Sequence, residues 1–209
     1  RCRSLSVEFA TAKTGQACGY YALDVGEPRK DIAGNLLIYQ DSSGGENWRS
    51  HNHLNRQEKI PVTFQGFEVR EGQHIVSQGR RATPYIALST NGVSMVASVK
   101  HFWQNFAKAL ELDAGNLKIH LFPRHFKDLF ELQGGEQKTH TIYVNIKDGP
   151  IQDGWLDWIH KPLVPQVSPE WYYTSGACPR PVPPNSVASD AYCSNYQHIV
   201  DVAIRSERS

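Results

Sequence analysis

"TPYIALSTNGVSMVASV" (residues 83–99) is the stretch that decides the fold class. Two runs rich in β-branched and other apolar residues flank the dipeptide Asn91-Gly92. Asn-Gly is the preferred pair for a two-residue type I′ turn, because both turn residues take a positive φ. The stretch therefore predicts a β-hairpin whose turn lies at residues 91–92.

Alternation of apolar and polar residues continues on both sides of this hairpin, in the segments "SLSVEFA", "NLLIYQ", "NLKIHLF" and "THTIYVNI". In "VTFQGFEVR" the apolar phase switches at Gly66, which predicts a β-bulge there. "HFWQNFAKALEL" (101–112) fits a helix and a strand equally well, since its spacing is helical but its aromatic residues suit a strand. The strand periodicity over residues 5–148 predicts an all-β fold, an antiparallel β-sandwich.

The composition changes after Gly149, where Pro and aromatic residues replace the alternating pattern. This composition predicts an extended, partly polyproline-like arm that runs over a surface. Near the end, "ASDAYCSNYQHIVDVAI" predicts a short helix with Ser189 or Asp190 as its N-cap. The expected organisation is an N-terminal strand or arm, a β-sandwich and a Pro/aromatic-rich C-terminal arm, over residues 1–18, 19–148 and 149–209.

The four cysteines fall into one pair near each end of the chain, Cys2 with Cys18 and Cys178 with Cys193. Each pair would close a loop of about 15 residues, for which loop-closure entropy predicts about 3 kcal/mol. Three connectivities exist, and the two local bridges are the preferred one. Disulfides imply an oxidising compartment, extracellular or periplasmic. The alternative is four free thiols in a cytosolic protein.

The charge balance argues against nucleic-acid binding, because 22 basic residues are set against 21 acidic ones. No apolar run reaches the roughly 18 residues that a membrane span needs. The first residues lack the apolar core of a signal peptide and do not begin with Met, so we expect a mature product or a fragment of a longer chain. A nucleophile elbow, a phosphate-binding loop and a dinucleotide fingerprint are all missing from the sequence.

The most unusual polar segment is "QDSSGGENWRSHNHLNRQEK" (residues 40–59), which we call the 40–59 loop. If it were a strand, His51 and His53 would share a face and could ligate one metal ion. A third ligand would have to come from Asp41, Glu46 or His140. Asp41 and Glu46 on the Gly-rich turn could also hold calcium, but the EF-hand spacing is missing. No cofactor is therefore predicted.

A sugar-binding surface fits the residue types of the 40–59 loop better than a metal site. Trp48 offers an apolar face to a pyranose ring, and Asn, His and Arg side chains bind hydroxyls and carboxylates. The alternative is an ordered loop that satisfies its own Asn and Ser side chains. The predicted carbohydrate-binding residues are Trp48, Arg49, His51, Asn52, His53, Arg56, Arg81, Lys138 and His140.

The last three of these residues lie outside the 40–59 loop. Arg81 follows Arg80, and this pair suits either recognition of a uronate carboxylate or protection of an edge strand. Lys138 and His140 alternate with Glu136 after a Gly-Gly turn, which favours either an acid–base set or a solvated strand face with cross-strand ion pairs.

Four segments in order, "DSSGGENWRSHNH", "FWQNFAKALEL", "LFPRHFKDLFELQGGEQKTH" and "HKPLVPQVSPEWYYTSGA", resemble the exo-rhamnogalacturonan lyase-like family of polysaccharide lyases. The resemblance covers residues 36–175 and corresponds to the central β-sandwich of that family, which also has an N-terminal β-domain and a C-terminal α/α-toroid. It implies that residues 101–112 form a strand. It also implies proton abstraction next to a uronate carboxylate, followed by β-elimination.

The chain departs from this family because the toroid that carries much of the active cleft is missing. The resemblance therefore implies only a central-domain contribution, from His51, Asn52, His53, Arg56, Lys138 and His140. The C-terminal arm, with its two cysteines, matches nothing in the family.

Three functions are possible as hypotheses. The first is a secreted, non-catalytic sandwich module that binds acidic polysaccharide or scaffolds a lyase catalytic domain. The second is a structural subunit that assembles with copies of itself into an extracellular fibre, through exchange of the N-terminal strand and the C-terminal arm. The third is a stand-alone lyase acting on uronate polysaccharides.

Overall fold

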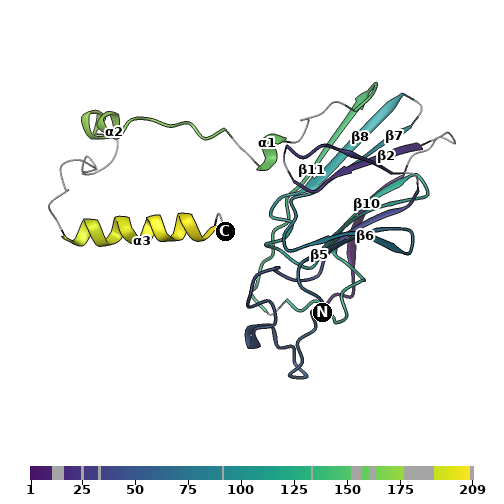
Figure 1. Ribbon diagram of the computed structural model, residues 1–209, viewed down its shortest axis with the longest axis horizontal. Coiled ribbons are helices and arrows are strands. Elements are labelled where there is room, and N and C mark those ends of the chain that lie inside the picture. The colour runs from purple at the N-terminus through teal and green to yellow at the C-terminus, as the bar shows by residue number, and fades with distance from the viewer. Residues whose placement is uncertain are drawn as a thin grey trace. The chain divides into compact units, whose positions relative to one another are not determined.

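The computed structural model divides into two compact units, Arg1–Pro162 and Leu163–Ser209 (Figure 1). The residues that the structure describes are 1–10, 17–24, 26–32, 34–90, 92–132, 134–151, 157–160, 163–176 and 191–207. The first unit contains two antiparallel sheets that pack face to face. The predicted all-β sandwich is therefore confirmed.

One sheet has six strands in the order β1-β10-β9-β4-β5-β6. Neighbouring strands are antiparallel throughout, and register shifts occur within β1 and β5. Because β4 and β9 are central, their residues are paired on both sides. The strands are β1 (Leu5–Phe9), β10 (Asn116–Phe122), β9 (Lys108–Asp113), β4 (Leu36–Gln40), β5 (Phe67–Glu71) and β6 (His74–Gly79).

The second sheet has five strands in the order β11-β8-β7-β2-β3. Its central hairpin joins β7 to β8, and Thr90 pairs with Val93 across the predicted turn. Gly92 has a φ of 80°, as a type I′ turn requires, while Asn91 lies outside the described residues. The strands are β11 (Ile142–Asp148), β8 (Val93–Val99), β7 (Tyr85–Thr90), β2 (Ala17–Ala22) and β3 (Lys30–Ile32).

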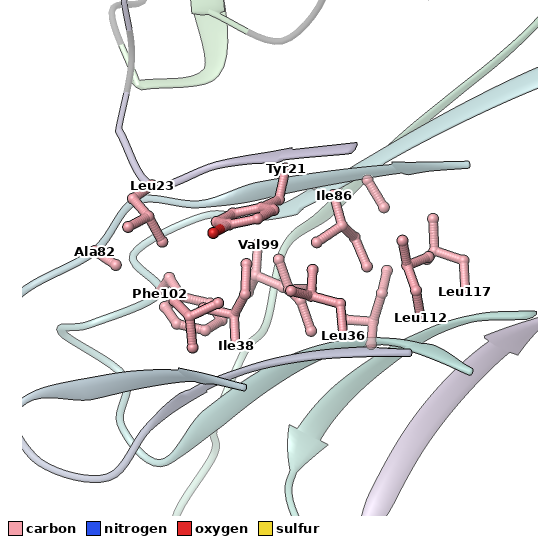
Figure 2. Packing of buried hydrophobic residues seen from close by; sticks show 14 of the residues in the cluster. Tyr21, Leu23, Leu36, Ile38, Ala82, Ile86, Val99, Phe102, Leu112 and Leu117 are labelled. Carbon is pink, nitrogen blue, oxygen red and sulfur yellow. The ribbon is translucent and has the colours of Figure 1, made fainter. Parts of the chain in front are cut away.

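The hydrophobic core lies between the two sheets (Figure 2). Alternate residues of the central strands point inward, as the sequence pattern predicts. Leu36 and Ile38 of β4 face Tyr21 and Ile86 of the other sheet, and all four are almost completely buried. Each such aliphatic side chain contributes about 1.5–3 kcal/mol through its burial. Phe102, which precedes β9, is also fully buried and closes the core at that side.

Two local expectations need correction. Gly66 forms no β-bulge, because it is not part of a strand: β5 begins at the next residue, Phe67. Residues 101–105 form turns and only the second half of "HFWQNFAKALEL" is a strand, β9. The sequence pattern is ambiguous because Phe102 lies in a turn segment and is nevertheless buried in the core. The spacing of the apolar residues in this segment therefore reflects neither a helix nor a strand.

The predicted disulfide between Cys2 and Cys18 is wrong, because both residues are free cysteines. Cys2 forms an isolated β-bridge with Phe130, and its thiol donates to the carbonyl of Ser4. Cys18 belongs to β2 of the five-stranded sheet and pairs with Ser89. The two cysteines are therefore paired with different segments, Cys2 with Phe130 and Cys18 with Ser89. Cys178 lies outside the described residues, as does the side chain of Cys193, so that bridge stays a prediction.

In the part of the chain that the structure describes, three helices follow the strands: α1 (Asp157–His160), α2 (Pro169–Ser175) and α3 (Ala191–Glu207). α3 confirms the predicted C-terminal helix, although both expected N-cap residues lie outside the described part of the chain. α2 is an addition to the predicted extended arm. Ser168 caps it by accepting from the backbone N–H of Trp171, and Gly176 ends it with a left-handed φ. No helix among the described residues is long and apolar enough to span a membrane.

Candidate functional site

The 40–59 loop starts from a buried carboxylate, Asp41, which directly follows β4. One carboxylate oxygen accepts from the hydroxyl of Tyr39. The other accepts from the backbone N–H of Thr63, from the Thr63 hydroxyl and from the backbone N–H of Phe64. Burial and the hydrogen bond to Asp41 both raise the pKa of Tyr39, so this phenol stays protonated. Asp41 therefore joins the start of the loop to residues 63–64, and both of its carboxylate oxygens accept hydrogen bonds.

A second set of hydrogen bonds clamps the start of the loop to the end of β6. The Gln40 side-chain amide donates to the carbonyls of Ser42 at 2.7 Å and Arg80 at 2.9 Å. The Ser42 hydroxyl accepts from the backbone N–H of Gly66 at 2.8 Å. Gly44 has a φ of +71°, and a Cβ there would lie 1.8 Å from the carbonyl oxygen of Arg80. The loop is thus held in one conformation by buried polar contacts.

His51-Asn52-His53 forms a short 3₁₀-helix, not a strand. Ser50 caps it by accepting from the backbone N–H of Asn52. Since a 3₁₀-helix has three residues per turn, His51 and His53 do not share a face. The His53 ring instead packs edge-on against Phe106, with 5.5 Å between the ring centroids. Among the described residues, no group of three His, Cys, Asp or Glu side chains could hold a metal ion.

Two arginine–tryptophan pairs lie at the turn of the loop. The guanidinium of Arg49 stacks over Trp48 at 4.3 Å from the ring centroid, and that of Arg81 stacks over Trp103 at 4.2 Å. Arg81 also donates to the carbonyl of Ser43 at 3.4 Å. A Cβ on Gly45 would lie 3.6 Å from an Arg81 nitrogen, and the backbone of Gly45 accepts from Trp48. Both pairs therefore flank the same turn.

Among the described residues, neither Arg49 nor Arg81 forms a salt bridge. Trp103 was not among the predicted binding residues, although it lies in the aromatic segment "HFWQNF". In the sequence, Trp103 looks like part of a core segment because it adjoins Phe102, an aromatic residue that is indeed fully buried in the structure. Only the folded chain shows that the two neighbours separate, one into the core and one under Arg81.

Arg56 has a different role from the other arginines of the loop. Its side chain forms a salt bridge with Glu131 at 2.8 Å, and Arg1 binds the same carboxylate at 2.9 Å. Nearby, the Asn55 amide donates to Asp128 at 2.6 Å. These contacts attach the 40–59 loop to the segment that follows β10. Exposed pairs of this kind contribute at most about 1 kcal/mol each, so they position the loop without dominating its stability.

Lys138 and His140 meet a third basic residue, Lys108, around the ring of Phe122. The amines of Lys108 and Lys138 lie 5.6 Å and 5.7 Å from the ring centroid, and the His140 ring lies 5.3 Å away. Lys108 is fully buried and donates to the carbonyls of Ala107 at 3.2 Å and Leu121 at 2.6 Å. We call these three basic residues the Phe122 cluster. Nothing in the sequence pattern around Lys108 indicates that it belongs to this cluster.

Burial and mutual repulsion change the protonation of the Phe122 cluster. Burial and then the charge of Lys138 lower the pKa of Lys108 to about 7. Burial also lowers the pKa of Lys138. Burial, with the charges of both lysines, lowers the pKa of His140 to about 4, so its imidazole is neutral at physiological pH. Both ring nitrogens of His140 are buried without a hydrogen-bond partner.

A further polar pair lies on the outer face of the six-stranded sheet. His120 of β10 and Glu111 of β9 are joined by a 2.6 Å hydrogen bond, and both side chains are largely buried. This hydrogen bond lowers the pKa of Glu111. The ring of His125 lies edge-on to His120, and burial lowers its pKa. The pair was not predicted, because alternation on β9 and β10 assigns these positions to a solvated face.

The predicted residues therefore fall into two groups, one on and beside the 40–59 loop and one in the Phe122 cluster. Comparison with known proteins adds no relative: no protein-family model, no curated protein and no solved structure matches the chain. The function must accordingly be inferred from the chemistry of these two groups.

Proposed function

We propose that this chain is a β-sandwich module that binds acidic polysaccharide on the surface formed by the Arg49–Trp48 and Arg81–Trp103 pairs. The observation that carries the proposal is the stacking of each guanidinium on an indole face, at 4.3 Å and 4.2 Å, without a salt bridge among the described residues. The 40–59 loop also resembles a segment of a lyase family that acts on uronate polymers.

The physical basis is the pairing of an apolar face with a fixed planar donor. An indole ring packs against the C–H face of a pyranose, while its neighbour Arg offers parallel N–H groups to a carboxylate. Stacking on the ring orients the guanidinium before a ligand arrives, which reduces the entropy lost on binding. The buried contacts of Asp41 and Gln40 hold the loop in place, which contributes to the same preorganisation.

The proposed module binds without cleaving. The loop supplies aromatic, amide and guanidinium groups, and its buried carboxylate, Asp41, is engaged by backbone and hydroxyl donors. β-Elimination needs a base and an acid next to the sugar, and a catalytic partner domain would provide them. Assembly by donation of the N-terminal strand has less support, because β1 already pairs with β10 of the same chain.

Affinity electrophoresis in gels that contain polygalacturonate tests the proposal. The wild-type protein is expected to be retarded, and Trp48→Ala or Arg81→Ala is expected to lose about tenfold in affinity, since each removes one stacking or ion-pairing contact. Neutral galactan in the gel gives no retardation. The matched control is Trp171→Ala, which removes a half-exposed tryptophan of α2 outside the sandwich.

Two results would remove the proposal. One is wild-type mobility that does not change in any uronate-containing gel. The other is equal retardation of the wild type and both variants, provided that circular dichroism shows the variants to be folded. A new absorbance of unsaturated uronate products during incubation would instead support a lyase and contradict binding without cleavage.

A further inference from the structure

The Phe122 cluster has no carboxylate partner in the part of the chain that the structure describes. Buried charges in proteins are generally paired or hydrogen-bonded. Lys108 is 0% exposed, yet only two backbone carbonyls accept from its amine. Among the described residues, none of Lys108, Lys138 and His140 forms an ion pair with a carboxylate.

Three separate segments bring these groups to one aromatic ring. Lys108 is the first residue of β9, Phe122 is the last residue of β10, and Lys138 and His140 lie on the segment that leads into β11. The Phe130 ring packs against Phe122 at 4.7 Å and closes another side of it. Lys138 is the exposed member, so it marks where the cluster opens to solvent.

We propose that Lys108, Lys138 and His140 form a binding site for a carboxylate anion. The two amines supply the charge, and the neutral imidazole donates one N–H to the anion, which gives a partner to a ring nitrogen that now has none. The ring of Phe122 forms the floor beneath the two ammonium groups. This site shares no residue with the arginine–tryptophan surface, so the proposal does not rest on polysaccharide binding there.

Anion binding at this site is coupled to protonation of Lys108. The charged groups that act on its amine are Lys138 beside it and the carboxylate that arrives. A bound carboxylate favours the ammonium form, whereas burial and Lys138 disfavour it. Because the pKa of Lys108 is about 7 without ligand, binding above that pH requires uptake of a proton. The affinity is therefore expected to fall by up to about tenfold per pH unit above pH 7.

Isothermal titration calorimetry with sodium galacturonate, and with galactose as the neutral probe, tests the site. The wild type is expected to bind galacturonate and not galactose. Lys108→Met and Lys138→Met are expected to weaken binding at least tenfold, while Lys100→Met, a change of an exposed lysine after β8, leaves it unaltered. Repeating the titration in two buffers of different ionisation enthalpy measures the proton uptake. If Lys108→Met does not fold, the exposed Lys138 variant carries the test.

The source of the carboxylate is decided by a second arm, with trigalacturonate as probe. If a polymer supplies it, trigalacturonate binds more tightly than the monomer; if a free small carboxylate is the ligand, the two bind equally, and both results support the site. Monomer binding that survives in Trp48→Ala shows that the site is independent of the arginine–tryptophan surface. No heat with about 10 mM galacturonate, a concentration that detects even a weak complex, overturns the proposal. Equal binding of galactose, or undiminished binding by both lysine variants, overturns it as well.

Discussion

Asp41 and Lys108 lie close together at the ends of two adjacent strands, yet their surroundings are opposite. Gln40, which precedes Asp41, pairs with Lys108 across β4 and β9. Both residues are 0% exposed, and they form no salt bridge with each other. Asp41 accepts hydrogen bonds from Tyr39, Thr63 and Phe64, whereas Lys108 has two carbonyls and faces another cation, Lys138.

This difference shows that Asp41 has a structural role, whereas Lys108 remains available to bind a ligand. The donors around Asp41 are Tyr39, Thr63 and Phe64, which are part of the same folded chain, so folding alone satisfies the carboxylate. Burial, together with the charge of Lys138, disfavours the ammonium form of Lys108, so folding alone leaves the charged amine in an unfavourable state. Of two equally buried ionisable residues, one is therefore part of the scaffold and the other is a candidate for binding. Four changes test this distinction.

Asp41→Ala is expected to have the largest effect on folding. It leaves the backbone N–H groups of Thr63 and Phe64 and the buried hydroxyl of Tyr39 without an acceptor. The expected loss is about 3–5 kcal/mol in the free energy of unfolding, measured by urea denaturation. Asp148→Ala, at the exposed end of β11, should stay within about 0.5 kcal/mol of the wild type. A similarly small loss for Asp41→Ala would mean that the loop is not anchored there.

Lys108→Met tests the other side of the comparison through the pH dependence of stability. The folded-state pKa of about 7 lies below the ordinary value of 10.5, so between these values the unfolded chain binds a proton that the folded chain does not. Wild-type stability therefore rises with pH in this window, relative to the variant. The difference between the two proteins should change by on the order of 3 kcal/mol between about pH 6.5 and pH 9.5. If urea unfolding gives the same stability difference between the wild type and Lys108→Met at both pH values, the pKa of Lys108 is not lowered.

Gly66→Ala tests how closely the backbone at Gly66, beside the start of the 40–59 loop, packs against the end of β6. Gly72→Ala is its control. Both glycines have a positive φ, but a Cβ on Gly66 would lie 2.0 Å from the Gly79 carbonyl oxygen, whereas one on Gly72 meets nothing within 4 Å. We expect a loss of roughly 3 kcal/mol for Gly66→Ala and of about 1 kcal/mol for Gly72→Ala, measured by thermal or urea unfolding. Equal losses would show that the backbone near Gly66 can relax.

Glu111→Gln should have the smallest effect and probes an intermediate case, a carboxylate with one His partner. The hydrogen bond from His120 lowers the pKa of Glu111, so its contribution is present above the unfolded value of 4.5 and is lost as the pH falls through the folded pKa. The variant should lose about 1 kcal/mol at neutral pH and progressively less at acidic pH. Glu27→Gln, an exposed change, is the control. If the loss of stability in Glu111→Gln does not depend on pH, it results from altered packing and not from the charge of Glu111.

The fold was largely predictable because short-range rules dominate it. Alternation in "NLLIYQ" and "NLKIHLF" corresponds to β4 and β10, and Asn91-Gly92 joins β7 to β8. The absence of a bridge between Cys2 and Cys18 was not predictable, since sequence spacing does not report with which segment each cysteine pairs. The same holds for the 3₁₀-helix at His51–His53, where the Ser50 cap outweighs the strand-like pattern.

The candidate sites were only partly predictable, for a physical reason. Trp48, Arg49, Arg81, Lys138 and His140 were identifiable because polar and aromatic side chains in irregular segments stand out against a regular pattern. Trp103 and Lys108 did not stand out, because each adjoins an apolar run and its role depends on the direction of its side chain.

The sequence by itself determined the all-β architecture, the main hairpin and the identity of the polar loop, since these depend on alternation and turn residues that act over a few positions. The tertiary structure alone decided which buried charge is satisfied. Pairing of β4 with β9 brings Asp41 and Lys108 close together, but the donors of Asp41 come from residues 63–64 and the cationic neighbours of Lys108 from residues 138–140. Contacts between segments so far apart in the chain leave no periodic trace in the sequence, and they exist only once the strands have paired.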